Sequence, residues 1–270
     1  MKLEVLLSCM HQQDESLVRD SRLTGDVVII NQCDREDYRE YPTATGTARM
    51  FSTRQRGLTR SRNMAIEQSR ADICLLCDDD EQFVSGYEEK ILSAYSQLPR
   101  ADVIVFKITN RRPSFPDKVR RLRFPLTMKV SSWQISFRRR SLLTAGIRFD
   151  ELLGAGTGNG AEEELKFLTD CEKAGLQIWY VPDEIASVAQ EASTWFSGFT
   201  ETFFENRGAT TRYILGPAMA GAYAVYYALA KWPLYAGSLT TIQALRATFR
   251  GIRENKIGVQ AQQKTWEYSK

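Results

Sequence analysis

The sequence has little of what metal-binding and disulfide-rich folds use. It contains one histidine, His11, and five cysteines, of which only Cys74 and Cys77 have the CxxC spacing of a zinc or redox site. These two lie in an apolar run that is predicted to be a strand, where residues three apart point to opposite faces and cannot share a metal. With no second CxxC to complete a ligand set, we expect no structural zinc and reduced thiols in a cytosolic compartment.

The chain also lacks a strong net charge and internal repeats, and its first residues do not have the pattern of a signal peptide. Its 36 Lys and Arg against 33 Asp and Glu leave a net charge of +3, which argues against a general nucleic-acid binder. The N-terminus has one Lys and a short apolar stretch that Glu4 interrupts, and no small-residue cleavage site follows. We therefore expect a first strand there and not a signal peptide.

Hydrophobic periodicity predicts an alternating α/β chain of 270 residues. Strands are expected at 3–10, 26–33, 71–78, 101–109, 130–142 and 176–183, and helices at 13–23, 57–70, 86–98 and 161–175. A basic, proline-broken stretch between 111 and 129 is expected to be a long loop. This order predicts an open sheet of parallel strands with crossover helices, in which ligands gather at the carboxyl ends of the strands.

The last part of the chain is apolar in a different way. Residues 213–230 carry no charge, and the length of this run is near the lower limit of a membrane span. A break follows at 231–233. Apolar residues then recur at helical spacing with arginines off the stripe: Tyr235, Leu239, Ile242, Leu245, Phe249 and Ile252. This pattern fits helices that lie on an anionic membrane surface, or helices that simply pack on the core; both stay open, and a full span is less favoured.

Three aspartates, Asp78, Asp79 and Asp80, follow the apolar run 73–77 directly. Like charges at this spacing repel one another, so a positive group is expected beside them. Hard divalent cations such as Mn²⁺ or Mg²⁺ prefer carboxylate oxygens and often bridge protein to a diphosphate. The alternative is a solvated acidic turn. An Asp-x-Asp pair, Asp78 and Asp80, would supply one metal ligand and one contact to a ribose or a water.

The combination of three motifs resembles the family 2 glycosyltransferases of the GT-A fold. A strand ending in "CDDDE" is preceded by "GLTRSRNMAI" and followed by "GAGTGNGAEEELKFL", and the likeness covers about residues 3–205. It is similar in particular to bacterial enzymes that build capsular or O-antigen polysaccharide. The resemblance implies a nucleotide-sugar-binding half at 1–110 and an acceptor-binding, catalytic half at 111–205 of one GT-A domain. Apolar and amphipathic helices at 206–270 would extend that domain.

The resemblance also implies a nucleotide-sugar site. Its expected members are Met10, His11, Asp34, Arg60, Arg62, Asn63, Asp78 and Asp79. Asp34 would read a uracil, Met10 and His11 would border the nucleotide, and the arginines at a helix start would face the diphosphate. Asp78 would contact the ribose or sugar.

The metal, the base and the acceptor contacts follow from the same resemblance. Asp80 would hold the Mn²⁺ or Mg²⁺ with Asp78, and Glu191 would replace a downstream histidine that this chain lacks. The catalytic base would be Glu164 or Glu163, because the usual Glu-Asp pair is here a run of three glutamates; helix capping is the alternative reason for acids at that place. Trp133 and Glu162 are expected near the acceptor.

The implied reaction is an inverting, metal-dependent transfer of one hexosyl or N-acetylhexosaminyl group from a UDP-sugar. The acceptor would be an oligosaccharide or a glycan on a polyprenyl diphosphate, and the enzyme would be cytoplasmic, peripheral at the inner face of the cell membrane. The Gln-x-x-Arg-Trp motif of processive members is absent, which favours one sugar per acceptor. A sugar nucleotidyltransferase is one alternative, although no glycine-rich loop follows the first strand. A non-enzymatic membrane-surface or RNA-binding protein is another, and it leaves both acidic runs unexplained.

Overall fold

The computed structural model describes the chain except residues 158, 160–161, 190–197, 259 and 261–270. It divides into two compact units. Unit 1 comprises Met1–Asp150 and Glu163–Glu191, and unit 2 comprises Glu151–Glu162 and Ala192–Lys270. The predicted boundary between residues 205 and 206 falls inside a helix of unit 2, whereas the glycine-rich segment 151–162 leaves unit 1 altogether.

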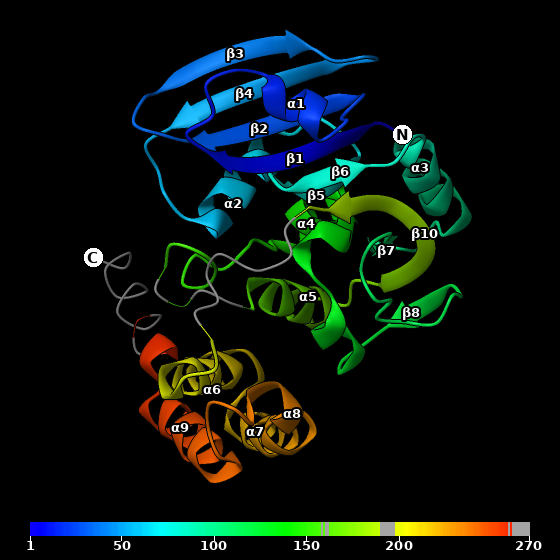
Figure 1. Cartoon of the computed structure of the whole chain (residues 1–270). Helices are drawn as coiled ribbons and strands as arrows, with labels where there is room; N and C mark the ends of the chain where they lie inside the picture. Colours follow the sequence, from blue (N-terminus) through cyan, green and yellow to red (C-terminus); the bar gives the residue numbers. More distant parts are fainter. Residues whose placement is uncertain (158, 160–161, 190–197, 259, 261–270) are drawn as a thin grey trace. The chain divides into compact units, whose positions relative to one another are not determined.

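Unit 1 is built on one sheet, to which ten strands contribute among the described residues. Their order is β3-β4-β2-β1-β5-β9-β7-β10-β6, with β8 paired to β10 (Figure 1). The parallel set is β1 (Leu3–Met10), β2 (Asp26–Gln32), β4 (Thr47–Thr53), β5 (Ile73–Asp78), β7 (Val103–Ile108) and β10 (Ile178–Val188). Running against them are β3 (Asp37–Pro42), β6 (Glu81–Phe83), β8 (Arg120–Leu122) and β9 (Ile135–Arg138). This mostly parallel open sheet confirms the predicted fold class.

Helices cover both faces of the sheet because its strands are apolar on both sides. Apolar residues of α1 (Ser16–Asp20) and α3 (Tyr87–Gln97) pack on one face; α2 (Leu58–Gln68), α4 (Arg139–Ala145) and α5 (Glu163–Lys173) pack on the other. On β5, Cys77 belongs to the first cluster and Cys74 to the second. The two side chains therefore point to opposite faces, as their spacing on a strand predicted. All five cysteines are buried, free thiols.

Several parts of the sheet differ from the prediction. The strands β3 and β4 lie between residues 34 and 56, where no element was predicted; β3 is a polar strand at the sheet edge, and edge strands carry little hydrophobic signal. The short strand β8 lies in the stretch 111–129 that was expected to be a long loop, and β6 was not predicted. The single strand expected at 130–142 was wrong. A 3₁₀ turn at Ser132–Gln134, β9 and the start of α4 occupy that range. Because β9 is short and buried between β5 and β7, periodicity alone could not place its ends.

The connections of β1 and β5 mark where a ligand is expected. The chain leaves β1 toward β2 and β4, returns to β5 on the other side of β1, and continues from there toward β7. The carboxyl ends of β1 and β5 therefore form a topological switch point, the usual ligand position in an open α/β sheet. His11 follows one of these ends, and Asp78 closes the other.

Unit 2 is helical over its described residues. It contains α6 (Glu201–Leu215), α7 (Pro217–Ala230), α8 (Trp232–Tyr235) and α9 (Thr241–Glu254). The uncharged run 213–230 is split at Gly216, whose φ of 80° ends α6, and Pro217 opens α7. The expected apolar stripe is likewise divided, since Tyr235 is in α8 and a Thr240–Gln243 capping box starts α9. None of the described helices is long and apolar enough to cross a membrane.

Two glycines let α6 and α9 approach each other closely. A Cβ on Gly208 would lie 2.1 Å from the carbonyl oxygen of Thr248, and one on Gly251 would lie 1.8 Å from that of Glu205. Both distances are far inside van der Waals contact, so neither position accepts a side chain. The pair of helices is the packed centre of unit 2, and Phe204, Tyr235, Ala244 and Ala247 form its apolar cluster.

Candidate active site

The positive group beside the three aspartates is Arg62. This residue lies on α2 and is only 1% exposed, and its Nη2 donates to both carboxylate oxygens of Asp78, at 2.9 and 3.3 Å. Burial opposes the charged form of the guanidinium, but the carboxylates of Asp78, Glu163 and Glu164 outweigh that effect and raise its pKa. The repulsion at the end of β5 is thus met by a buried cation that the protein supplies itself.

Asp78 makes further hydrogen bonds besides those that it accepts from Arg62. Ser132 Oγ donates to its Oδ2 at 3.0 Å, and its own backbone N–H donates to Glu81 Oε1 at 3.0 Å. Glu81 is 1% exposed, and burial together with the charge of Asp78 raises its pKa well above the ordinary range. The sequence reasoning missed both partners. Glu81 was visible as the fourth acid of the run, whereas nothing marked Ser132.

Asp79 and Asp80 begin the turn after β5. Loss of solvent, and then the charge of Asp78, raise the pKa of both carboxyl groups. The possible ligand atoms are all oxygens, which fits a hard divalent cation. A bound cation would lower the pKa of these carboxyl groups again, because it favours their charged form. Among the described residues, no three metal-ligating side chains converge on one point. These residues therefore fit a cation that is held by one or two carboxylates. Its other ligands would come from a substrate or from water.

Two neighbouring glutamates at the start of α5 have different environments. Glu163 is buried, and its Oε1 accepts a hydrogen bond from Arg62 Nη1 at 3.1 Å. Burial and the charge of Glu163 raise the pKa of Glu164 to about 8, which Arg62 opposes. Glu163 is thus engaged in an ion pair, whereas the carboxyl group of Glu164 keeps its proton to a higher pH than an ordinary glutamate does.

Arg62 links the aspartate strand to the helix that carries these glutamates. One guanidinium joins Asp78 and Glu163, which come from β5 and α5, and it lies over the ring of Phe149 at 5.4 Å. Asn63 clamps the backbone of Phe149: its Nδ2 donates to the carbonyl oxygen at 2.9 Å, and its Oδ1 accepts from the N–H at 2.8 Å. The predicted Arg-Asn pair is thus engaged by protein partners, so its contact to a diphosphate stays a prediction.

The expected nucleotide residues follow neighbouring strand ends. His11 comes after β1 with a φ of 54°, and its N–H donates to the carbonyl oxygen of Gln32 at 3.1 Å. Asp34 comes after β2 with its side chain 88% exposed, where it forms an ion pair with Arg56. Met10 at the end of β1 and Arg60 in the first turn of α2 are exposed. The structure brings these residues to one edge of the sheet, and their contact to a nucleotide stays a prediction.

The three remaining expected residues have different outcomes. Trp133 follows Ser132 and is half-buried, with the Arg111 guanidinium 5.9 Å from its ring centre. Glu162 belongs to unit 2, where it forms an ion pair with Arg207 at 2.7 Å, and its contact to an acceptor stays a prediction. Glu191 lies outside the described residues.

Comparison with known proteins agrees with the fold. No curated protein sequence matches the chain. Among solved structures, S. aureus TarS 1-349 is similar with a TM-score of 0.58 at 15% identity, over 95% of this chain and 82% of that one. The same protein in complex with UDP-GlcNAc gives 0.60 at 16%, over 92% and 79%. Identities this low show the fold alone. Residues 5–152 match the family described as glycosyl transferase family 2. The chain therefore belongs to glycosyl transferase family 2.

Proposed function

We propose that this glycosyltransferase moves one sugar from a UDP-sugar to a hydroxyl group of a glycan acceptor, with inversion at the anomeric carbon. The observation that carries the proposal is the buried Arg62, which joins Asp78 to Glu163 and leaves Glu164 with a pKa of about 8. One ion-pair network thus connects the acidic strand end with a carboxyl group suited to take a proton. Carboxylates with a purely structural role would not require Glu163 in an ion pair next to Glu164 with a raised pKa.

The donor is proposed to be a UDP-sugar, of a hexose or an N-acetylhexosamine. Asp34 is exposed at the sheet edge where a base would lie, and Met10 and His11 follow the neighbouring strand. S. aureus TarS, which has the same fold, has been crystallised with UDP-GlcNAc and with UDP. Arg60, at the exposed start of α2, is the arginine that we assign to the diphosphate, because Arg62 already has two carboxylate partners.

A divalent cation, Mn²⁺ or Mg²⁺, is proposed to be held by Asp80 with Asp78. When bound, it would supply positive charge for the departing nucleoside diphosphate. The contribution of the protein is the fixed orientation of Asp78 by Ser132, Arg62 and the Glu81 carboxyl group. Asp78 would also contact the ribose or sugar, and Asp79 would belong to the same nucleotide-sugar site.

Glu164 is proposed to be the general base. It would remove the proton from the acceptor hydroxyl, whose oxygen forms the new bond to the anomeric carbon as the bond to the diphosphate breaks. The Glu163 carboxylate is instead engaged with the Arg62 guanidinium at 3.1 Å. Trp133, next to the Asp78 partner Ser132, would stack on a sugar ring of the acceptor.

The acceptor is proposed to be a glycan on a polyprenyl diphosphate, used in capsular or O-antigen synthesis with one sugar added per acceptor. The enzyme would then work from the cytoplasm at the inner face of the cell membrane. The resemblance of the motifs to enzymes of this kind supports both proposals.

The first experiment is hydrolysis of a panel of nucleotide sugars with Mn²⁺, Mg²⁺ or a chelator. We expect slow UDP release from one donor with metal, which Asp80→Ala abolishes. Asp20→Ala removes an exposed aspartate of α1 and serves as the matched control, with unchanged release. If no nucleotide or nucleotide sugar binds with or without metal, the proposal is wrong. Consumption of a nucleoside triphosphate with release of diphosphate would instead indicate a nucleotidyltransferase.

A further inference from the structure

Helix α7 of unit 2 has no charged residue on its solvent side. Its exposed positions are all Pro, Ala, Met, Val, Tyr or Leu, and Leu229 is 65% and Tyr226 55% exposed. The opposite side carries Ala220, Ala224 and Ala228, which are buried. A surface helix normally exposes charged and polar residues to water. Helix α7 exposes apolar residues instead, which is unfavourable in contact with water.

The exposed apolar surface continues beyond α7. Trp232 and Leu234 of α8 are 49% and 60% exposed, directly after the end of α7. Contiguous apolar surface of this kind on a soluble unit marks an interaction site. Trp, Tyr and Leu at its centre are the residues that partition to the boundary between lipid headgroups and acyl chains.

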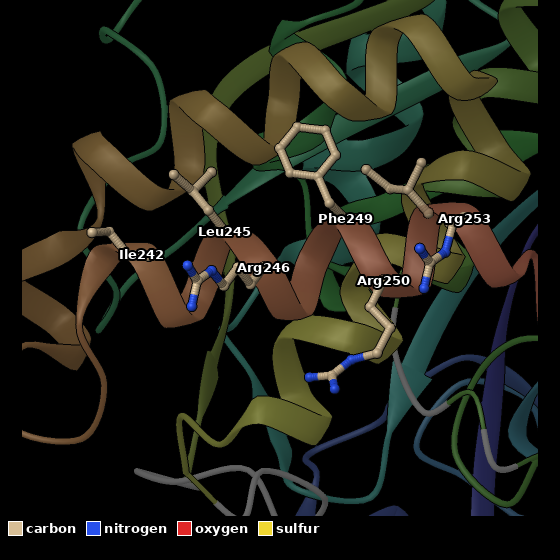
Figure 2. Close-up of a pocket in the computed structure, with 7 residues that line it drawn as sticks. Ile242, Leu245, Arg246, Phe249, Arg250 and Arg253 are labelled. Carbon is tan, nitrogen blue, oxygen red and sulfur yellow. The ribbon is translucent and has the colours of Figure 1, made fainter.

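A groove on α9 combines apolar and basic residues. It has a volume of about 540 Å³ and is lined by α9 residues alone, from Ile242 to Arg253. Figure 2 shows Leu245 and Phe249 on one side of the helix, and Arg246 and Arg250 pointing to the other. Phe249 borders α7, because a Cβ on Gly221 would lie 3.7 Å from its ring. The groove therefore adjoins the apolar side of α7.

Positive charge predominates around this surface, although Glu254 follows Arg253 at the end of α9, where it pairs with Lys256. From Asn206 to Arg253 the sequence has no Asp or Glu and six Lys or Arg. Arg250 is paired with Glu201 and Glu205 of α6. The exposed Lys231, Arg246 and Arg253 have no ion-pair partner among the residues that the structure describes. These three cations are available to an anionic partner.

We propose that this surface docks on an anionic lipid bilayer, with α7 lying in the plane of the membrane. It consists of the exposed side chains of α7 and α8 and the α9 groove with Lys231, Arg246 and Arg253, and we name it the α7–α9 face. A helix of 14 residues is about 21 Å long, too short for a hydrocarbon core of about 30 Å. Apolar burial with positive charge is the combination that binds amphipathic helices to anionic membranes.

This proposal rests on the proposed function in one respect: the α7–α9 face would bring the enzyme to a lipid-linked acceptor. Lipid binding needs neither sugar donor nor acceptor, so it is measured on the full chain without substrates. UDP binding is measured on the same samples. A failure of docking with intact UDP binding, or the reverse, then separates the two proposals.

The test is co-sedimentation with vesicles of phosphatidylcholine, with and without about one third phosphatidylglycerol. We expect binding to the anionic vesicles that falls with salt. Arg246→Gln with Arg253→Gln should weaken binding by about 25-fold, roughly fivefold for each arginine. The charge-matched control, Arg100→Gln with Arg140→Gln, removes two exposed arginines of unit 1 and should bind as the wild type does.

A second pair of variants tests the apolar contribution. Leu229→Gln with Leu234→Gln should lower binding at high salt, where the charge contribution is screened, while Leu143→Gln on α4 of unit 1 should not. Equal binding to both vesicle types, or no binding, overturns the proposal. Sedimentation of a dimer that Leu229→Gln with Leu234→Gln dissociates, without vesicle binding, would assign the α7–α9 face to a second copy of the chain.

Discussion

The acidic site of unit 1 and the α7–α9 face of unit 2 depart from ordinary burial in opposite directions. Around Arg62, charged side chains are buried and satisfied by one another. On α7, apolar side chains are exposed and satisfied by nothing that the structure describes. Each departure costs stability in water, which suggests that each is kept for a function. The ion pairs of the first lie within the chain, whereas for the second we propose a partner outside it.

The largest expected effect comes from the proposed base. Glu164→Gln keeps the size of the side chain but cannot take a proton, so transfer should fall by about 10²- to 10⁴-fold. UDP binding should persist, because the change leaves the strand ends alone. The measurement is transfer to acceptor at saturating donor, with calorimetric UDP binding alongside. A variant that keeps most of its transfer rate would remove Glu164 from the mechanism.

Breaking the buried network should be the largest change in stability. Arg62→Met leaves Asp78 and Glu163 without their common partner, and removal of one member of a buried ion pair costs about 3–5 kcal/mol. The control is Arg148→Met, which breaks an exposed pair with Glu67 and should cost less than about 1 kcal/mol. Urea unfolding of both variants makes the comparison. Equal stability of the two would mean that the network is not what holds α2, β5 and α5 together.

In unit 2 the expected cost is steric. Gly251→Ala would place a Cβ 1.8 Å from a backbone oxygen of α6, and overpacking of this kind costs about 1–3 kcal/mol. Gly221→Ala on α7 meets only a ring atom at 3.7 Å and should be neutral or slightly stabilising. Thermal unfolding followed by circular dichroism distinguishes them. If both glycines tolerate alanine, α6 and α9 do not pack as closely as described.

A smaller loss is expected at the start of α9. Thr240→Ala removes the side-chain oxygen that accepts from the Gln243 N–H, a cap worth about 1 kcal/mol. Thr240→Ser should restore most of it. The free energy of unfolding of the three proteins gives the answer, and an alanine variant as stable as the serine variant would contradict the capping box.

The smallest expected change is a shift in the pH dependence of the transfer rate. Because the charge of Glu163 helps to raise the pKa of Glu164 to about 8, Glu163→Gln should move the acidic limb of the rate profile to lower pH. The folded protein holds this proton to higher pH than the unfolded chain does. Stability should therefore fall as pH rises from about 4.5 to 8 in the wild type and stay flatter in Glu164→Gln. An unmoved acidic limb in Glu163→Gln would mean that another group sets it.

The motifs located the site better than they assigned its members. The run of aspartates after a buried strand correctly indicated a positive group beside it, and the spacing of Cys74 and Cys77 correctly placed the two thiols on opposite faces of the sheet. The same motifs put Arg62 on a diphosphate and grouped Glu162 with its two neighbours. The structure adds the protein partners of both residues: Arg62 pairs with Asp78 and Glu163, and Glu162 pairs with Arg207 in unit 2. Neighbouring residues at a helix start point about 100° apart, so Glu162 and Glu163 can meet different partners.

The sequence by itself determined the α/β class, the edge of the sheet where the acids lie, and the uncharged length of α7, because periodicity and strand ends are local properties. Only the tertiary structure decided which glutamate is paired with Arg62, a residue 101 positions away, and that Ser132 and Glu81 hold Asp78. It also decided that α7 buries alanines and exposes Leu229. Such choices depend on which elements meet, and loops of any length can bring them together.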